Sequence, residues 1–392
     1  MTLGVLLFVA AIIVVVMIHE AGHFLMAKLF HFKATKFFFG FGPTLWSFTK
    51  GETEYGIKAI PAGGFVKIVG MNPYEEVPPE DQARAYSNKP RWQRALVLVA
   101  GSGTHFIVAF LILLVTAVTI GYPTGGVTNE VAAVNGVRGA TTPAIEAGIE
   151  PGDRIVGVGG TPTSSWAEIR SYIRAHGGQE ATFTVESDGE TRTVEVTLGQ
   201  ALFRGQDLVD YAAPGETLRA AEPGETVSGF FGVSPQPEFE TMSFPAAIPD
   251  AGSKTWYVVT RSVEGIKDVF GMVFGGELWD ALTGEGERAV DEGPLGLVGA
   301  GRIAGESVQR GNLLDLVALI VGFTVFVGIM NLLPLPPLDG GHLAVLGWEA
   351  VTRKQVDVRK LIPVAAAVIS FFVLLFIAVL YLDLARPIKA PF

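Results

Sequence analysis

The stretch Met17-Ile18-His19-Glu20-Ala21-Gly22-His23-Phe24 places three polar side chains inside the first apolar run of the chain. Helix residues four apart share one face, so His19 and His23 can offer two imidazole nitrogens to one metal ion. Glu20 points beside that pair, where a carboxylate reaches a metal-bound water without being a ligand. Two core histidines at this spacing are the alternative, but buried polar groups are costly among apolar residues unless something satisfies them. The stretch therefore predicts a catalytic zinc site inside a membrane-spanning helix.

The composition indicates an integral membrane protein. Hydrophobic residues make up 49% of the 392 residues and charged residues only 17%, and the mean hydropathy is +0.40. The net charge of −10, without a basic stripe, argues against a nucleic-acid partner. Because the chain has no cysteine, disulfides and thiolate ligands are excluded, and any zinc must be held by His, Asp or Glu.

Four segments are long and apolar enough to cross a bilayer, which takes about 20 residues. The first lacks the basic start and the cleavage site of a signal peptide, so we expect it to be retained. Lys and Arg are concentrated after the first and third segments, and the positive-inside rule places those loops in the cytoplasm. Both termini and the long middle region are then outside. The four segments are Leu3–Met26, Ala95–Ile120, Leu313–Leu338 and Leu361–Leu382.

The first loop reads as strand rather than helix. Three aromatic or β-branched runs, Phe37–Phe41, Tyr55–Ile60 and Phe65–Val69, are bounded by glycine and proline, and Gly40-Phe41-Gly42-Pro43 is a turn signal. We predict a membrane-associated β-loop region. The residues leave open whether it is a plain cytoplasmic sheet or an exposed edge that pairs with an extended substrate.

The middle region begins with a compact α+β domain between Val127 and about Gln200. It resembles a PDZ domain, a class that usually binds a peptide as an added strand. A domain that only blocks access sterically, as a size filter, is the alternative, and we favour it over peptide binding. The elements behind the resemblance are a turn and strand over Ala147–Val156, a helix over Trp166–His176, and strands Thr182–Glu186 and Thr193–Leu198 around an Asp188-Gly189 hairpin turn.

The stretch that follows this domain is acidic and rich in proline and glycine over residues 203–253, which predicts irregular structure or a solvated linker. From Trp256 to Val273, apolar residues then recur at steps of three and four, which predicts an amphipathic helix, with a place on the outer membrane surface favoured over packing on the domain.

Two motifs are rejected. Gly299–Ala304 formally matches a dinucleotide-binding fingerprint, but no strand precedes it and an apolar segment follows. Gly101-Ser102-Gly103 invites a serine-protease interpretation, but small residues in a membrane span more often allow close helix packing. His105, one turn later, is expected to face the interior of the helix bundle.

Asp339 is the preferred third zinc ligand. It follows Asn331–Leu338, where three prolines break the third span, and irregular backbone at membrane depth persists only in protein or beside a polar cavity. A carboxylate at that break needs a partner, and a catalytic zinc needs a third protein ligand. His342 is interpreted as a supporting or merely packed residue. Glu52 and Glu54 are set aside because they lie in an aqueous loop.

Together these motifs resemble the site-2 protease family of intramembrane zinc metalloproteases. Their order is similar to that in the bacterial regulator of sigma-E protease, and a single PDZ domain resembles the actinobacterial members. The resemblance implies Zn²⁺ held by His19, His23 and Asp339, with Glu20 as general base. One departure is that relatives commonly have Asn in the pattern that here reads Ala100–His105. The resemblance also implies these substrate-binding residues: Asn331, Gly40, Phe41, Gly42, Phe65 and Val66.

The implied activity is that of a metalloendopeptidase that cleaves peptide bonds within or near transmembrane segments, of anti-sigma factors or signal-peptide remnants for example. The implied location is a bacterial cytoplasmic membrane, with the lipid bilayer and transmembrane proteins as partners and with an extracytoplasmic PDZ domain. A membrane-tethered PDZ receptor with a vestigial metal site is the alternative, and a metal transporter suits a single site with a carboxylate base poorly.

The predicted fold is thus a multi-pass α-helical membrane protein with four transmembrane helices, a membrane-associated β-loop region and an α+β PDZ domain. The predicted regions are 1–28 (first transmembrane helix), 29–94 (β-loop region), 95–121 (second transmembrane helix), 122–202 (PDZ domain), 203–253 (acidic irregular segment), 254–310 (amphipathic helix and connector), 311–345 (third transmembrane segment with the Leu-Asp-Gly motif) and 360–385 (fourth transmembrane helix).

Overall fold

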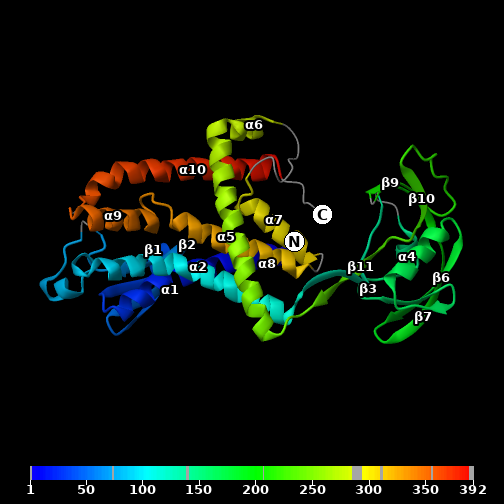
Figure 1. Ribbon diagram of the computed structural model, residues 1–392, viewed down its shortest axis with the longest axis horizontal. Coiled ribbons are helices and arrows are strands. Elements are labelled where there is room, and N and C mark those ends of the chain that lie inside the picture. Colours follow the sequence, from blue (N-terminus) through cyan, green and yellow to red (C-terminus); the bar gives the residue numbers. More distant parts are fainter. Residues whose placement is uncertain are drawn as a thin grey trace. The chain divides into compact units, whose positions relative to one another are not determined.

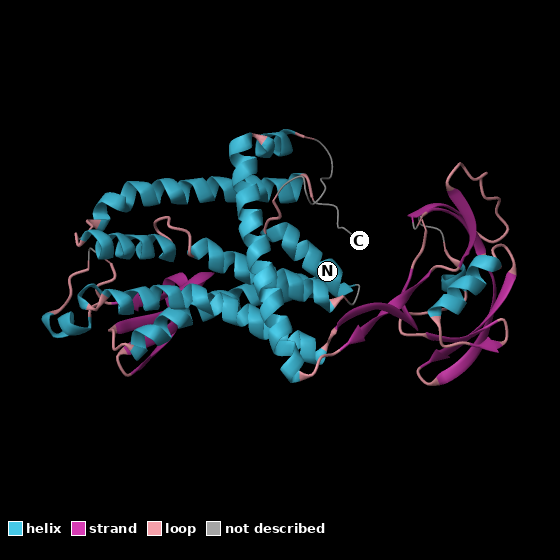
Figure 2. Cartoon of the chain, in the orientation of Figure 1, coloured by secondary structure: helices cyan, strands magenta, loops and turns pink. Residues whose placement is uncertain are grey.

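The computed structural model describes residues 2–72, 75–137, 141–205, 207–284, 294–309, 312–354 and 356–387. The chain divides into two units, each of which is described here by itself. The first unit comprises Met1–Val118 and Ser243–Phe392, and the second comprises Thr119–Met242. In the described part of the first unit, the only strands are β1 and β2. The regular structure of the second unit consists mostly of strands (Figure 2).

Four of the described helices are long and apolar enough to cross a membrane, as the sequence predicts. They span Leu3–Leu29, Arg91–Thr119, Leu313–Asn331 and Arg359–Ala385. The helices of the first unit are α1 (Thr2–Leu29), α2 (Arg91–Thr119), α5 (Phe244–Gly275), α6 (Glu277–Thr283), α7 (Leu297–Gln309), α8 (Leu313–Asn331), α9 (Asp339–Thr352) and α10 (Ile362–Ala385), with 3-10 turns η1 (Pro79–Arg84), η2 (Tyr86–Asn88) and η4 (Val358–Leu361) (Figure 1).

The third span ends earlier than predicted. Helix α8 stops at Asn331, and regular helix resumes only at Asp339, where α9 begins. Pro334, Pro336 and Pro337 lie between them; proline lacks the N–H that continues a helix, and its ring clashes with the preceding turn. The break therefore places Asp339 at the first position of a new helix.

The β-loop region is built from two long strands, β1 (Ala34–Lys50) and β2 (Thr53–Ile68), rather than from separate short ones. Both strands bend where their register shifts. Phe37 therefore has two strand neighbours, Val66 on one side and Tyr55 on the other, and Tyr55 in turn also pairs with Phe48. The predicted runs are segments of these bent strands. Residues 64–68 pair with β1 along one side only. That segment is therefore an edge of the sheet.

Helix α7 is an element that the sequence patterns did not predict. It packs on α1 so closely that a side chain at Gly4 would lie 2.7 Å from the Cα of Gly305. Phe8, Ala300 and Ala304 are buried in this contact. The stretch that formally matches a nucleotide fingerprint is therefore a small-residue packing surface, which supports its rejection.

Helix α5 starts at Phe244, twelve positions before the predicted Trp256, and packs against α8. Phe270 and Phe274 stack on Phe371 of α10, with ring centroids 5.9 and 6.3 Å apart. Figure 1 shows α5 crossing these helices rather than running along them. Its position relative to a membrane surface stays a prediction.

The second unit contains two antiparallel sheets. The larger has the order β11-β3-β4-β6-β7, with β5 beside β4, and the smaller has the order β10-β8-β9. Helix α4 (Trp166–Ala175) packs Ile169 and Ile173 into the core around Phe183 and Phe231. The strands are β3 (Tyr122–Val134), β4 (Arg154–Val158), β5 (Thr161–Pro162), β6 (Glu180–Ser187), β7 (Glu190–Thr197), β8 (Gly199–Arg204), β9 (Asp207–Ala212), β10 (Glu225–Phe230) and β11 (Val233–Glu240), and α3 is Pro143–Glu146.

The predicted hairpin is present in this unit. Strands β6 and β7 pair from Glu180 with Thr197 to Ser187 with Glu190. Asp188 and Gly189 join the strands with φ of 50° and 83°, as a tight hairpin turn requires. The helix over Trp166–Ala175 also matches its prediction, while the assignment of the unit to the PDZ class stays a prediction.

The prediction of irregular structure over residues 203–253 is wrong for most of this stretch, although residues 213–224 form no helix or strand. It covers β9, β10 and β11 and the start of α5. Strand β11 pairs with β3 across about 100 residues, so local periodicity is a poor guide there, whereas β9 directly follows its partner β8. The acidic residues are also partly neutralised: hydrogen bonds from Arg219 lower the pKa of Glu225 to about 2, and Arg204 lies 3.0 Å away.

Candidate metal centre and active site

Three ligand-type atoms from two distant parts of the chain converge in the first unit. The Nε2 atoms of His19 and His23 lie 3.1 Å apart, and they lie 3.4 and 3.2 Å from Oδ2 of Asp339. Both histidines are buried, with exposed fractions of 9% and 7%. Within the described residues, these three form a group that could hold a metal ion.

The donor set fits a zinc ion. Asp339 Oδ2 is buried, and no described residue donates a hydrogen bond to it. The Nδ1 of His23 lies 2.8 Å from the Val97 carbonyl, which can only accept, so His23 carries its proton there and turns the lone pair of Nε2 inward. Lone pairs and a carboxylate facing one another repel unless a cation lies between them. Two imidazoles and one carboxylate are the ligands that a catalytic zinc takes.

A close contact between α1 and α2 places the histidines. A side chain at Gly22 would lie 2.5 Å from the Ala100 carbonyl oxygen, and one at Gly101 would overlap the ring of His23. Both positions therefore require glycine for this packing. Gly101 of the Gly-Ser-Gly stretch accordingly serves close packing, as predicted, and leaves room for the ring of His23, whereas a side chain at Gly103 would meet no atom within 4 Å.

Asp339 and His342 lie on the same helix but have different surroundings. Asp339 is the first residue of α9, directly after the proline break, and reaches the histidine pair. His342 follows about one turn later and lines a neighbouring cavity. Among the described residues it does not join the three-residue group, so the geometry favours Asp339 as the third ligand.

Glu20 lies beside the group and outside it. Its Oε2 accepts a hydrogen bond of 3.0 Å from the backbone N–H of Val66. Strand β2 approaches α1 tightly here, because a side chain at Gly64 would lie 2.8 Å from Met17 Sδ and 3.3 Å from Glu20 Cγ. The edge strand is therefore anchored to the carboxylate that stands next to the metal centre.

The predicted substrate-binding residues separate into two sets. Phe65 and Val66 lie on the edge segment of β2, next to Glu20. The ring of Phe65 stacks against Phe41 at 5.9 Å, so Phe41 supports that segment from β1.

Gly40 and Gly42 shape the bend of β1. Their φ values are 83° and 82°, which a side chain rarely allows, and a Cβ on Gly40 would lie 2.6 Å from the Ile60 carbonyl oxygen. Asn331 is the last residue of α8, at the start of the proline break. For Gly40, Gly42 and Asn331, a direct part in substrate binding stays a prediction.

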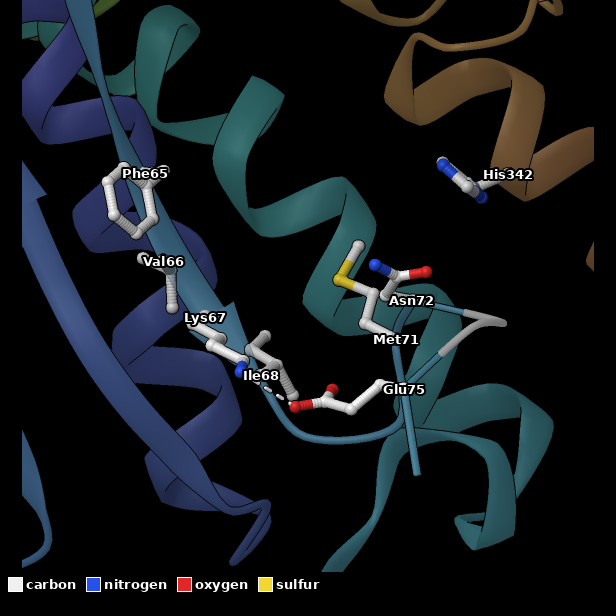
Figure 3. Close-up of a pocket in the computed structure, with 8 residues that line it drawn as sticks. All are labelled: Phe65, Val66, Lys67, Ile68, Met71, Asn72, Glu75 and His342. Atoms are coloured by element: carbon white, nitrogen blue, oxygen red, sulfur yellow. Dashed lines mark ion pairs between the residues drawn. The ribbon is translucent and has the colours of Figure 1, made fainter. Parts of the chain in front are cut away.

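A cavity of about 660 Å³ lies along the edge segment of β2. Figure 3 shows its lining: side chains of Phe65–Ile68 from β2, His342 from α9, and residues from the segment after β2. An ion pair of 2.9 Å between Lys67 and Glu75 crosses one end of it. The cavity is thus a mostly apolar trough with a charged end.

Glu52 and Glu54 take no part in the metal centre. Glu52 lies at the turn between β1 and β2, where Arg84 holds both carboxylate oxygens at 2.6 and 2.7 Å and Lys28 binds at 2.6 Å. The Arg84 hydrogen bonds lower the pKa of Glu52 to about 2, which keeps it charged. Glu54 pairs with Lys36 at 3.4 Å.

His105 is the contact that the sequence patterns missed. It is buried, as expected, and its Nε2 lies 3.1 Å from Nδ1 of His19. The spacing of His105 from other residues of α2 could have indicated this contact. His105 falls four residues after Gly101 and eight after Val97, so all three share the face of α2 that meets the motif helix.

Comparison with known proteins identifies the family of the chain. The chain matches the model of peptidase family M50 over residues 7–377. It is 32% identical to zinc metalloprotease Rip1 of Mycobacterium tuberculosis over 98% of each chain, and 31% identical to Rip1 of Mycolicibacterium smegmatis over 99% of this chain and 98% of that one. It is also 31% identical to metalloprotease MmpA of Caulobacter vibrioides, over 89% of this chain and 86% of that one. A buried two-histidine, one-carboxylate group among apolar helices and this full-length similarity lead to one conclusion: the chain belongs to peptidase family M50, the intramembrane zinc metalloendopeptidases of the site-2 protease type.

Proposed function

We propose that this protease cleaves transmembrane segments with His19, His23 and Asp339 as its zinc ligands and Glu20 as its general base. The observation that carries the proposal is the convergence of two Nε2 atoms and one unpartnered carboxylate oxygen within 4.8 Å. When bound, zinc supplies Lewis-acid chemistry, which polarises a scissile carbonyl and lowers the pKa of water to about 7.

Glu20 is placed to move protons. It accepts the water proton and returns one to the leaving amine, the two roles of a general base that then acts as an acid. The Val66 N–H occupies Oε2 and fixes the orientation of the carboxylate. The second oxygen is left for the reacting water.

The edge segment of β2 supports an extended substrate. A helical substrate hides its carbonyls in its own hydrogen bonds, so a transmembrane segment must unwind before it is cut. Pairing with a sheet edge replaces the lost backbone hydrogen bonds. Residues 64–68 of β2 offer such an edge, with the 660 Å³ cavity beside it and Glu20 in contact with Val66.

Cleavage by purified protein distinguishes the protease from a membrane-tethered receptor with a vestigial site. We expect a peptide with one transmembrane segment to be cut in detergent, with activity lost on treatment with a zinc chelator and restored by added zinc. The purified chain should contain one zinc per molecule. Chelator-resistant cleavage, or binding of the peptide without any cleavage, would contradict the proposal.

We also infer a topology in which the first and third loops are cytoplasmic and the second unit is extracytoplasmic. The Lys and Arg distribution supports it. Because the chain has no native cysteine, single cysteines report cleanly. Exposed positions Lys50 and Arg353, changed to cysteine, should resist an impermeant thiol reagent in intact cells, whereas Asp188→Cys should react. All three should react in lysed cells; labelling of Lys50→Cys in intact cells would invert the assignment.

A further inference from the structure

We propose that His105 is a positioning residue that accepts the Nδ1 proton of His19 and thereby turns the Nε2 lone pair of His19 toward the zinc. The inference rests on the proposed ligand role of His19. It assigns a function to a buried histidine of α2 that lies next to the proposed zinc ligands.

One face of α2 sets both histidines. Val97, Gly101 and His105 follow at steps of four residues and point the same way. The Val97 carbonyl holds Nδ1 of His23 at 2.8 Å, while Nε2 of His105 holds Nδ1 of His19 at 3.1 Å. His19 is thus held by a side chain, whereas His23 is held by a backbone carbonyl.

The directions of the ring atoms determine which nitrogen of His19 carries the proton. Nε2 of His19 faces His23 and Asp339, at 3.1 and 3.4 Å, so it is the atom that would bind a metal. A neutral imidazole carries its proton on the other nitrogen, and Nδ1–H of His19 then donates to Nε2 of His105. His105 in turn carries its proton on Nδ1.

The surroundings of His105 argue against a simple packing role. Its exposed fraction is 1%, and no described residue hydrogen-bonds its Nδ1, which is a costly arrangement for a space-filling side chain. Helix α8 nevertheless makes room for the ring at Gly328, where a Cβ would lie 2.8 Å from the Cβ of His105. The imidazole is thus held between α1 and α8 with its Nε2 directed at His19.

The Gly101 carbonyl is the competing acceptor, because it also lies within reach of the His19 ring. If that carbonyl took the proton, the His105 side chain would be dispensable for zinc binding. The two possibilities make opposite predictions for a variant that fills the same space without an acceptor.

Zinc affinity of the purified full-length protein, measured by competition with a chromophoric chelator, tests the proposal without reference to catalysis. His105→Leu should weaken zinc binding by about 10–100-fold, the usual loss when a partner of a metal-bound histidine is removed. His105→Gln, whose amide oxygen reaches the position of Nε2, should stay within about 3-fold of the unmodified protein. Ser102→Ala is the matched control, since Ser102 is also buried on α2 and its Oγ has no partner among the described residues.

The outcomes separate this inference from the proposed ligand set. His19→Ala must lose zinc if the ligand set is correct, and retention there would overturn the proposed function. Loss in His19→Ala with unchanged affinity in His105→Leu would overturn only the role of His105, as would an equal loss in His105→Leu and His105→Gln. If the leucine variant does not fold, His105→Gln is compared with His105→Met, which has a similar length but only a weak acceptor. Equal affinities would count against the hydrogen bond, and a loss confined to the Met variant would support it.

Discussion

Glu20→Gln should abolish cleavage and leave the zinc content of the purified protein unchanged. Glutamine has the shape of glutamate, and its amide oxygen can still accept the hydrogen bond from Val66, now 3.0 Å from Oε2. It cannot take a proton from water. Loss of general-base catalysis costs about 100- to 10,000-fold, so turnover of a transmembrane peptide should fall at least by that factor. Single-turnover cleavage and metal analysis of the same preparation measure both quantities.

A matched control for this substitution is Glu54→Gln. Glu54 lies on β2, as Val66 does, but its partner is Lys36, away from the metal group. Its replacement should leave cleavage and zinc content unchanged. Loss of zinc in Glu20→Gln would make Glu20 a ligand, and near-normal cleavage would remove it from the chemistry.

The parts of the site that could be predicted are those that local chemistry determines. The His19–His23 spacing places two nitrogens on one face whatever the rest of the fold does. The proline run before Asp339 marks a helix break in an apolar segment, where a carboxylate needs a partner. Both inferences use spacing or backbone chemistry alone, and the geometry agrees with both.

The contacts between helices were beyond such reasoning. The face of α2 that meets α1 depends on the packing of Gly22 against Ala100. The sequence therefore predicted that His105 faces the interior, but it could not predict His19 as its partner. Helix α7 was missed for a related reason. Its glycines lower the intrinsic helix propensity, and only the surface of α1 shows what its small residues pack against.

The prediction for the acidic residues 203–253 fails for another physical reason. Pro235 and Pro237 lie in β11, and proline usually weakens a strand assignment. Strand β11 persists because its register with β3 shifts at both prolines, and Pro235 and Pro237 pair with Val131 and Val127. The long-range partner therefore overrides the local signal.

Asp339→Ala should deplete zinc and abolish cleavage together, whereas His342→Ala should spare zinc. Asp339 Oδ2 lies 3.2 Å from His23 Nε2 and is the only carboxylate oxygen in the described three-residue group. Removing a direct ligand should weaken zinc binding by more than the roughly 10–100-fold that follows loss of a supporting partner. His342 lines the cavity along β2, so its loss should alter substrate handling at most. Metal analysis of both purified variants, with cleavage measured in parallel, gives the comparison.

The Asp339 variants also need a test of folding, because a carboxylate at the first position of α9 stabilises the helix end, by about 0.3–1 kcal/mol at an exposed site. Asp339→Asn keeps the size of the side chain and removes its charge. Like Asp339→Ala it should lose zinc, and its melting temperature, measured in excess chelator, should stay close to that of the equally metal-free unmodified protein. If both Asp339 variants retain zinc while His342→Ala loses it, the third ligand is His342. The carboxylate at the proline break would then have a different partner, and the unoccupied hydrogen-bonding capacity of Oδ2 would need another explanation.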